Sequence, residues 1–347
     1  MIDIRLLRDQ PDNVKARLAA RDPALVATVD EILHWDGLRR SAETNLQQIQ
    51  ADRNRLSKEI GKLRARKLDS SGLEADVKSR ATEMEELGRA GEEYAARQRD
   101  LLLSLPNLPH DKIPPGRTAA ENPLLRTWGE KPQIAEPQDH LAIATRLGLV
   151  DFERAAKVAG SGFVCFTGPG ARLERALINF LLDLHTREGG YVEVAPPHLV
   201  RPEALIGTSQ LPKFEDQLYR TSEDCLYLAP TAEVPVTNLH REEIVAELPI
   251  HYAAYTPCFR REAGSAGLGT RGLIRMHQFD KVELVKICAP ESAAAELETL
   301  TADAEKVLQR LGLHYRVIEL CAGDLGFGAT RTYDIEVWAP GQGDYLE

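Results

Sequence analysis

The sequence predicts an α+β protein in which a long antiparallel coiled-coil arm precedes a domain built on an antiparallel sheet. Two observations carry this prediction. Residues 27–104 contain no proline and repeat apolar side chains at alternating three- and four-residue steps, the period of coiled-coil helices. Residues 126–347 are dense in strand-like segments with few helices between them, which is typical of the α+β class. We expect a first domain at 1–104, a Pro-rich linker at 105–125 and a second domain at 126–347.

Composition and charge restrict the possible functions. Of the 347 residues, 43% are apolar and 28% charged, an ordinary globular composition. The net charge of −10 argues against a broad surface for nucleic acid, so any such contact must use a local basic patch. The sequence has no long apolar run and no secretory or transit pattern at its start, so we expect a cytoplasmic protein without membrane contact. Its five cysteines are widely spaced and form no CxxC pair, which predicts reduced thiols and no zinc.

The arm is predicted as two helices joined by a turn. Its first apolar seam consists of Ile32, Trp35, Ala42, Leu46, Ile49, Leu56, Ile60 and Leu63, and its second of Leu73, Val77, Met84, Leu87, Tyr94 and Leu101. Residues 68–72 between them have a turn composition, so the helices should pack antiparallel. Each has about 35 residues and should extend roughly 50 Å. Residues 1–22 are predicted to form a short strand and a helix at the base of the arm.

The distal end of the arm is strongly basic. Between Arg53 and Lys67 there are seven cations and one anion, Glu59, which leaves a charge of +6. These cations are Arg53, Arg55, Lys58, Lys62, Arg64, Arg66 and Lys67, and we define them as the basic tip. The heptads alone would fit a spacer or a dimerisation coil. Self-repulsion in the basic tip favours an anionic partner instead, and the phosphates of a nucleic-acid duplex suit it.

In the second domain, periodicity predicts one amphipathic helix and several strands. The helix is expected at 172–188, and the strands at 191–199, 226–228, 252–259, 273–285 and 333–337. Residues 160–170 contain two Gly-x-Gly groups that could suggest a phosphate-binding loop. However, the first is followed by Phe163–Phe166, which is predicted as a strand, and no third glycine opens a helix. A hairpin before the helix therefore explains this stretch better.

The stretch most informative about chemistry is 258–284, in which two predicted strands flank a Gly-rich loop. Alternation places Arg260 and Glu262 on one face of the first strand. It also places five residues of the second strand on one face, namely Arg275, His277, Phe279, Lys281 and Glu283. Such a set would suit a zwitterion, a phosphate and a flat ring. A surface hairpin of cross-strand ion pairs would explain the same residues, and the pattern alone does not decide between the two.

The Cys258–Glu262 strand, the loop and the second strand resemble motif 2 of class II aminoacyl-tRNA synthetases. Further stretches resemble seryl-tRNA synthetases of the bacterial type, in order along nearly the whole chain. They are 1–22, 149–158, 170–177, 210–214, 230–235 and 332–338. The resemblance implies a class II catalytic domain behind a tRNA-binding coiled-coil arm, with the basic tip as the tRNA contact.

The resemblance also implies roles for matching residues. Arg260 would bind the ATP α-phosphate as a catalytic residue, with Glu262 beside it at the nucleotide. Phe279 would stack on adenine, Arg261 would add an ATP contact, and Glu347 would contact ATP and Mg²⁺. The serine-binding residues would be Thr231, Ala232, Glu233, Arg275, which holds the carboxylate, and Glu283. The Arg172–Pro197 region resembles motif 1, which implies a homodimer.

The activity so implied is that of a serine–tRNA ligase. Such an enzyme uses ATP and Mg²⁺ to convert L-serine to seryl-adenylate, then transfers serine to tRNA(Ser), which has a long variable arm, and also to tRNA(Sec). Two departures from the family pattern stand out. Leu268–Gly269 replaces a charged pair in the motif 2 loop, and motif 3 would lie beyond Glu347. We therefore expect this chain to be a fragment that is inactive alone.

Two other functions fit parts of the sequence. A non-catalytic paralogue that only binds tRNA would explain a missing motif 3. An amino acid:carrier-protein ligase would resemble the catalytic domain, but such proteins lack the long arm.

Overall fold

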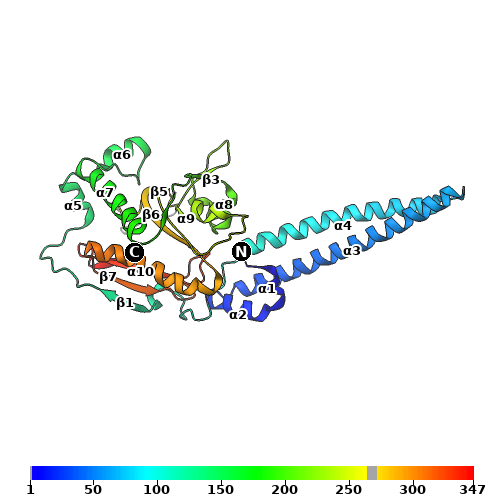
Figure 1. Ribbon diagram of the computed structural model, residues 1–347, viewed down its shortest axis with the longest axis horizontal. Coiled ribbons are helices and arrows are strands. Elements are labelled where there is room, and N and C mark those ends of the chain that lie inside the picture. The colour runs from blue at the N-terminus through cyan, green and yellow to red at the C-terminus, as the bar shows by residue number, and fades with distance from the viewer. Residues whose placement is uncertain (1, 264–271) are drawn as a thin grey trace. The chain divides into compact units, whose positions relative to one another are not determined.

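The computed structural model describes residues 2–263 and 272–347, and it divides into two compact units (Figure 1). The first unit comprises Met1–Glu121 and Cys321–Arg331, and the second comprises Asn122–Leu320 and Thr332–Glu347. A short segment near the C-terminal end of the chain thus belongs to the N-terminal unit. Arg21 holds it there, because its guanidinium donates to the carbonyl oxygens of Leu325 at 2.6 Å and Gly326 at 2.8 Å.

The N-terminal segment consists of two helices, α1 (Ile4–Asp9) and α2 (Pro11–Arg21). The strand predicted within residues 1–22 is therefore wrong for the described part. Asp3 explains the difference, because its side chain accepts from the Arg5 backbone N–H at 2.8 Å and so caps α1. Leu7 of α1, together with Val14 and Leu18 of α2, is fully buried in a core with the base of the arm.

The arm is a hairpin of α3 (Leu25–Ala65) and α4 (Ser71–Ser104), which run alongside each other in Figure 1. The predicted coiled coil is confirmed, and both helices have close to the expected length. The α3 seam is buried at Ile32, Ala42, Ile49, Leu56 and Ile60. The corresponding apolar residues of α4 are only half-buried, as expected where just two helices cover each other.

One polar group interrupts the apolar base of the arm. Asp36 of α3 is 2% exposed and accepts from Gln98 Nε2 of α4 at 2.7 Å. It also forms ion pairs with Arg8 at 2.9 Å and with Arg39 at 3.2 Å. Burying a carboxylate costs little free energy only when several donors contact it. The donors to Asp36 come from α1, α3 and α4, so they reach it together only when these helices are aligned. The contacts of Asp36 therefore favour this register at the base of the hairpin.

The second unit contains three sheets in its described residues. The four-stranded sheet has the order β1 (Leu124–Trp128), β7 (Tyr315–Glu319), β8 (Tyr333–Ala339) and β9 (Asp344–Leu346), all antiparallel. The three-stranded sheet has the order β2 (Val192–Glu193), β5 (Ile250–Phe259) and β6 (Gln278–Ile287), with β2 parallel to β5. β3 (Leu199–Val200) and β4 (Tyr227–Leu228) form an antiparallel pair. The α+β architecture with mainly antiparallel strands is thus confirmed.

Helices connect these strands. They are α5 (His140–Arg146), α6 (Phe152–Ala159), α7 (Pro169–Asp183), α8 (Pro202–Gly207), α9 (Glu233–Thr237) and α10 (Ala293–Leu311), and α7 continues into a π-helical turn at Leu184–Glu188. Short 3₁₀ turns lie at Ala119–Glu121, Glu215–Gln217, Asn238–His240 and Pro290–Ser292.

Three strand predictions in this unit need correction. The strand expected at 191–199 is two short strands, β2 and β3, because Pro196 and Pro197 cannot donate to a ladder. The strand expected at 273–285 begins only at Gln278. The strand expected at 163–166 is reduced to a single bridge between Val150 and Phe166. In the part of the chain that the structure describes, no helix is long and apolar enough to cross a bilayer.

Candidate active site

The β5–β6 pair forms the floor of the candidate site. Its register places Cys258 opposite Phe279 and Thr256 opposite Lys281. Because side chains alternate along a strand, Phe279, Lys281 and Glu283 of β6 share one face, as predicted. The strand opposite them is buried at Cys258, Thr256 and Ala254, which anchors this face to the domain.

The other predicted site residues lie beyond the strand ends. β5 ends at Phe259 and β6 begins at Gln278, so strand alternation does not align Arg260 with Glu262 or Arg275 with His277. This expectation was wrong. The segments after β5 and before β6 still contact each other, because the Arg260 N–H donates to the His277 carbonyl at 2.9 Å.

Glu262 and Arg275 face each other outside the sheet. An ion pair joins Arg275 Nη1 to Glu262 Oε2 at 2.6 Å. Glu262 has φ of 49°, the left-handed region that costs a non-glycine residue about 1–2 kcal/mol. Such a conformation persists only where its surroundings hold it in place, and it often marks a functional site.

Arg260 and Phe279 form a cation and ring pair. The Arg260 guanidinium lies 5.0 Å from the centre of the Phe279 ring, and its Nε donates to the Pro230 carbonyl at 3.2 Å. The flat ring and the fixed cation therefore lie side by side, which suits a ligand that combines an aromatic base with a phosphate.

A second polar group lies where the start of α9 meets β6. Thr231 is 4% exposed, donates to Glu283 Oε2 at 2.7 Å and accepts from Lys281 Nζ at 2.7 Å. Lys281 also pairs with Glu283. Burial raises the pKa of the nearby Glu233 carboxyl, and repulsion from Glu283 raises it further, while Lys281 and Arg260 oppose the shift. Ala232, which lies between Thr231 and Glu233 in the sequence, is fully buried. Its side chain therefore contributes to packing.

A cavity of about 1000 Å³ brings many of the predicted residues together. Arg260, Arg275, Phe279, Lys281 and Glu347 all line it. Sequence reasoning missed the segments 138–140 and 339–342, which also line it. Their composition gives no sign of this role, because these segments come close to the other lining residues only in the folded structure. Arg261 is exposed and is not among the lining residues.

Asp139 and Glu347 are the carboxylates that line this cavity. Glu347 is the one that could hold Mg²⁺, because the Asp139 side chain already accepts from the Ala142 N–H at 2.7 Å. Among the described residues, no group of three or more His, Cys, Asp or Glu side chains is placed to bind a metal ion. Mg²⁺ is commonly held by one or two carboxylates together with substrate phosphates and water. Glu347 lines the same cavity as Arg260 and Arg275 and fits that mode, in which a nucleotide supplies the other ligands.

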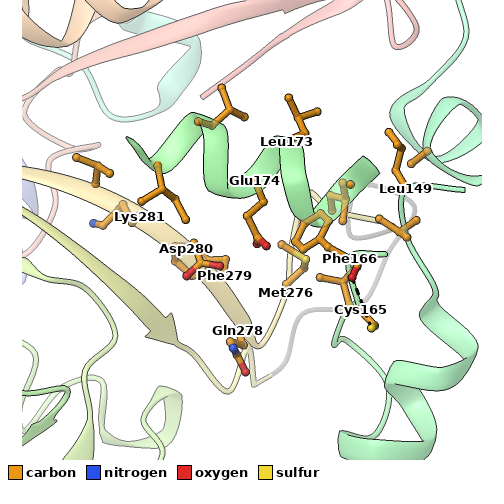
Figure 2. Close-up of a pocket in the computed structure, with 18 of the residues that line it drawn as sticks. Leu149, Cys165, Phe166, Leu173, Glu174, Met276, Gln278, Phe279, Asp280 and Lys281 are labelled. Atoms are coloured by element: carbon orange, nitrogen blue, oxygen red, sulfur yellow. Dashed lines mark hydrogen bonds between the residues drawn. The ribbon is translucent and has the colours of Figure 1, made fainter. Parts of the chain in front are cut away.

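A second cavity of about 660 Å³ lies between α7 and β6 (Figure 2). Its lining is mostly apolar, but Figure 2 shows Glu174 extending from α7 toward Asp280 of β6. Burial raises the pKa of Glu174 to about 7, and its hydrogen bond to Asp280 contributes. Asp280 also accepts from the Tyr255 hydroxyl at 2.6 Å. Burial, followed by this bond, raises the pKa of Tyr255.

At the far end of the arm, the basic tip is exposed except for Arg53, which is half-buried. Two of its cations have acidic neighbours, since Arg55 pairs with Asp52 at 3.0 Å and Arg64 with Glu74 at 2.9 Å. Lys58, Lys62, Arg66 and Lys67 have no ion pair with any acidic residue that the structure describes. The tip thus keeps a cluster of free positive charge.

The chain matches two family models whose descriptions agree with this architecture. Residues 213–347, which hold most of the site, match the tRNA synthetase class II core domain (G, H, P, S and T). The fold and the site thus define a class II aminoacyl-tRNA synthetase. Residues 1–109, which include the whole arm, match the seryl-tRNA synthetase N-terminal domain.

Individual relatives identify the family. The serine–tRNA ligase of Akkermansia muciniphila is 55% identical over 349 residues, covering 100% of this chain and 82% of that protein. The serine–tRNA ligase of Acidithiobacillus ferrooxidans is 51% identical with the same coverage. The crystal structure of seryl-tRNA synthetase from Pyrococcus horikoshii complexed with ATP matches with a TM-score of 0.91 and 36% identity, over 99% of this chain and 82% of that one.

This chain therefore belongs to the seryl-tRNA synthetase family, and it is an aminoacyl-tRNA synthetase of the serine–tRNA ligase type. The alternatives of a carrier-protein ligase and of a non-catalytic paralogue are not borne out by these relatives, and this chain spans 82% of the length of both ligases. The Leu268–Gly269 departure lies outside the described residues.

Proposed function

We propose that this chain forms seryl-adenylate in the 1000 Å³ cavity at the end of β6 and then transfers serine to tRNA. The observation that supports this is the convergence of Arg260, Phe279, Arg275 and Glu347 on one cavity. Beside it lies the hydrogen-bonded group of Thr231, Lys281 and Glu283.

In the first step, the serine carboxylate attacks the α-phosphorus of ATP and pyrophosphate leaves. Arg260 neutralises the charge that develops on the α-phosphate, and Phe279 beside it stacks on adenine. Glu262 holds Arg275 in reach of the serine carboxylate through their ion pair. Glu347 would hold Mg²⁺ at the nucleotide, and the ion would supply further charge neutralisation there. Little proton transfer is required, so positioning and fixed charge provide most of the rate enhancement.

Serine is held by groups of both signs. Arg275 pairs with the carboxylate of serine. The Arg275 guanidinium must then contact both this carboxylate and Glu262, which lies 2.6 Å away. Glu283 and Glu233 face the ammonium and hydroxyl groups of serine, and Thr231 fixes Glu283 by donating to it at 2.7 Å. The raised pKa of Glu233 should fall when the serine ammonium arrives, because an opposite charge favours the carboxylate.

For the second step, the basic tip binds the long variable arm of tRNA(Ser), and also tRNA(Sec), through phosphates. Two copies of the chain pair through the Arg172–Pro197 region. The exposed side chains of Leu173, Leu177 and Val192, which are 53%, 37% and 59% accessible, support this pairing. All five cysteines are free thiols, which fits a reducing cytoplasm.

Amino-acid-dependent exchange of pyrophosphate into ATP tests this function. With Mg²⁺ present, exchange should be fastest with serine. Threonine adds one methyl group, which a fitted pocket distinguishes by about 1–3 kcal/mol, so its kcat/KM should fall roughly 10- to 200-fold. Equal exchange with threonine or alanine would contradict the assignment.

A further inference from the structure

The left-handed conformation of Glu262 is held by a residue far away in the sequence. Gln217, at the end of the 3₁₀ turn Glu215–Gln217, contacts both chain neighbours of Glu262. Its carbonyl accepts from the Arg261 N–H at 2.8 Å. Its side-chain amide accepts from the Ala263 N–H at 3.0 Å and donates to the Ala263 carbonyl at 3.2 Å. Gln217 therefore fixes the backbone on both sides of Glu262.

Arg275 is held in a comparable way from another element. The Leu273 N–H donates to Nε2 of His140 at 3.1 Å, two residues before Arg275. His140 is the first residue of α5, whose cap Asp139 accepts from the Ala142 N–H at 2.7 Å. The ring also lies so close to Gly272 that a Cβ there would be 2.3 Å from Nε2. Gly272 has φ of 73°, so this approach requires glycine.

We propose that Gln217 and His140 are positioning residues for serine activation, because they hold the two backbone segments that bring Glu262 and Arg275 together. This rests on the proposed function of the cavity. Neither residue lies in the stretch 258–284, in which the sequence predicts the residues that contact substrates. Gln217 acts through Glu262, and His140 acts through Arg275.

The variants separate positioning from simple stability. Gln217→Met keeps the side-chain length but removes both amide hydrogen bonds. His140→Phe keeps a ring without an acceptor, whereas His140→Gln can still accept from the Leu273 N–H. Gln133→Met is the matched control, since Gln133 is exposed. Two readouts are used: hydrogen exchange at the Ala263 and Leu273 amides, and serine-dependent pyrophosphate exchange with kcat and KM measured separately.

We expect Gln217→Met to lose protection at Ala263 and to reduce kcat/KM about tenfold, with an unchanged melting temperature. In the Glu262→Gln background, the same substitution should reduce kcat/KM less than twofold, because its effect passes through Glu262. His140→Phe should lose protection at Leu273 and activity together, and His140→Gln should recover both. Gln133→Met should behave as wild type.

Equal losses from Gln217→Met in both backgrounds, or unprotected Ala263 and Leu273 amides in the wild type, would overturn the proposal. If the wild type shows no serine-dependent exchange, the proposed function fails first. Protection at the two amides then decides the positioning role: its loss in Gln217→Met and His140→Phe supports the role, and its persistence contradicts it.

Discussion

The arm and the catalytic cavity differ in the sequence distance over which their residues meet. α3 and α4 follow each other directly, and their seam residues recur every three or four positions. The cavity instead combines residues near 140, 260, 275 and 347. In the apolar seam of the arm, each contact repeats a local rule, so one change there shifts stability by a small share. In the cavity, each residue makes contacts that no other residue repeats, so one substitution can remove a whole function.

The largest expected effect lies in the cavity. Arg260→Ala should reduce serine-dependent pyrophosphate exchange by about 10²–10³-fold, since loss of one fixed group that neutralises transition-state charge costs about 2.7–4 kcal/mol. Arg146→Ala, a change at an exposed arginine of the same unit, should leave the rate unchanged. A loss below tenfold would show that Arg260 does not contact the reacting phosphate.

The largest expected effect in the arm concerns its one buried carboxylate. Asp36→Ala leaves the Gln98 amide and two guanidinium groups without their shared acceptor. Breaking such a network should lower the free energy of unfolding by about 3 kcal/mol, measured by urea denaturation with circular dichroism. Asp100→Ala, an exposed change on the same hairpin, is the control. Similar midpoints for both variants would mean that the apolar seam alone sets the register.

Free and paired cations of the basic tip should differ in their contribution to tRNA binding. Replacing Lys58, Lys62 and Lys67 with Gln should flatten the slope of log Kd against log salt by about one unit for each lost phosphate contact. Replacing Arg55 and Arg64 should flatten it less per residue, because Asp52 and Glu74 already engage them. Slopes that fall equally per residue would show that these ion pairs open on binding.

The smallest expected effect concerns Glu174 and its dependence on pH. Because its folded pKa is raised to about 7, its stabilising contribution is complete below its ordinary pKa and is lost as pH rises through 7. Glu174→Gln cannot ionise and should therefore be more stable than the wild type at pH 8, but not at pH 4. Water screens this half-exposed group, so we expect about 1 kcal/mol, or 2–4 °C in melting temperature.

Thermal melts at both pH values, with the exposed Glu203→Gln as control, test this prediction. A gain of the same size at pH 4 and pH 8 would show that Glu174 does not titrate in this range.

The same contrast explains what could be predicted from the sequence. The arm followed from its heptads, and the shared face of Phe279, Lys281 and Glu283 followed from alternation, because both are local periodicities. The ends of β5 and β6 did not follow, since the turn at Glu262 is held by Gln217 and the approach to Arg275 by His140. Hydrogen bonds between segments 46 and 133 residues apart leave no periodic trace. The return of 321–331 to the first unit has a similar origin, in the carbonyl contacts of Arg21.

The central claim is that serine activation and tRNA binding belong to separate parts of this chain. The most direct test measures two properties, pyrophosphate exchange and the Kd for tRNA(Ser), on Arg260→Ala and on the Lys58, Lys62 and Lys67 triple variant. We predict that Arg260→Ala loses exchange but binds tRNA as the wild type does, and that the triple variant exchanges normally but binds tRNA weakly. Loss of both properties in either variant would contradict the account.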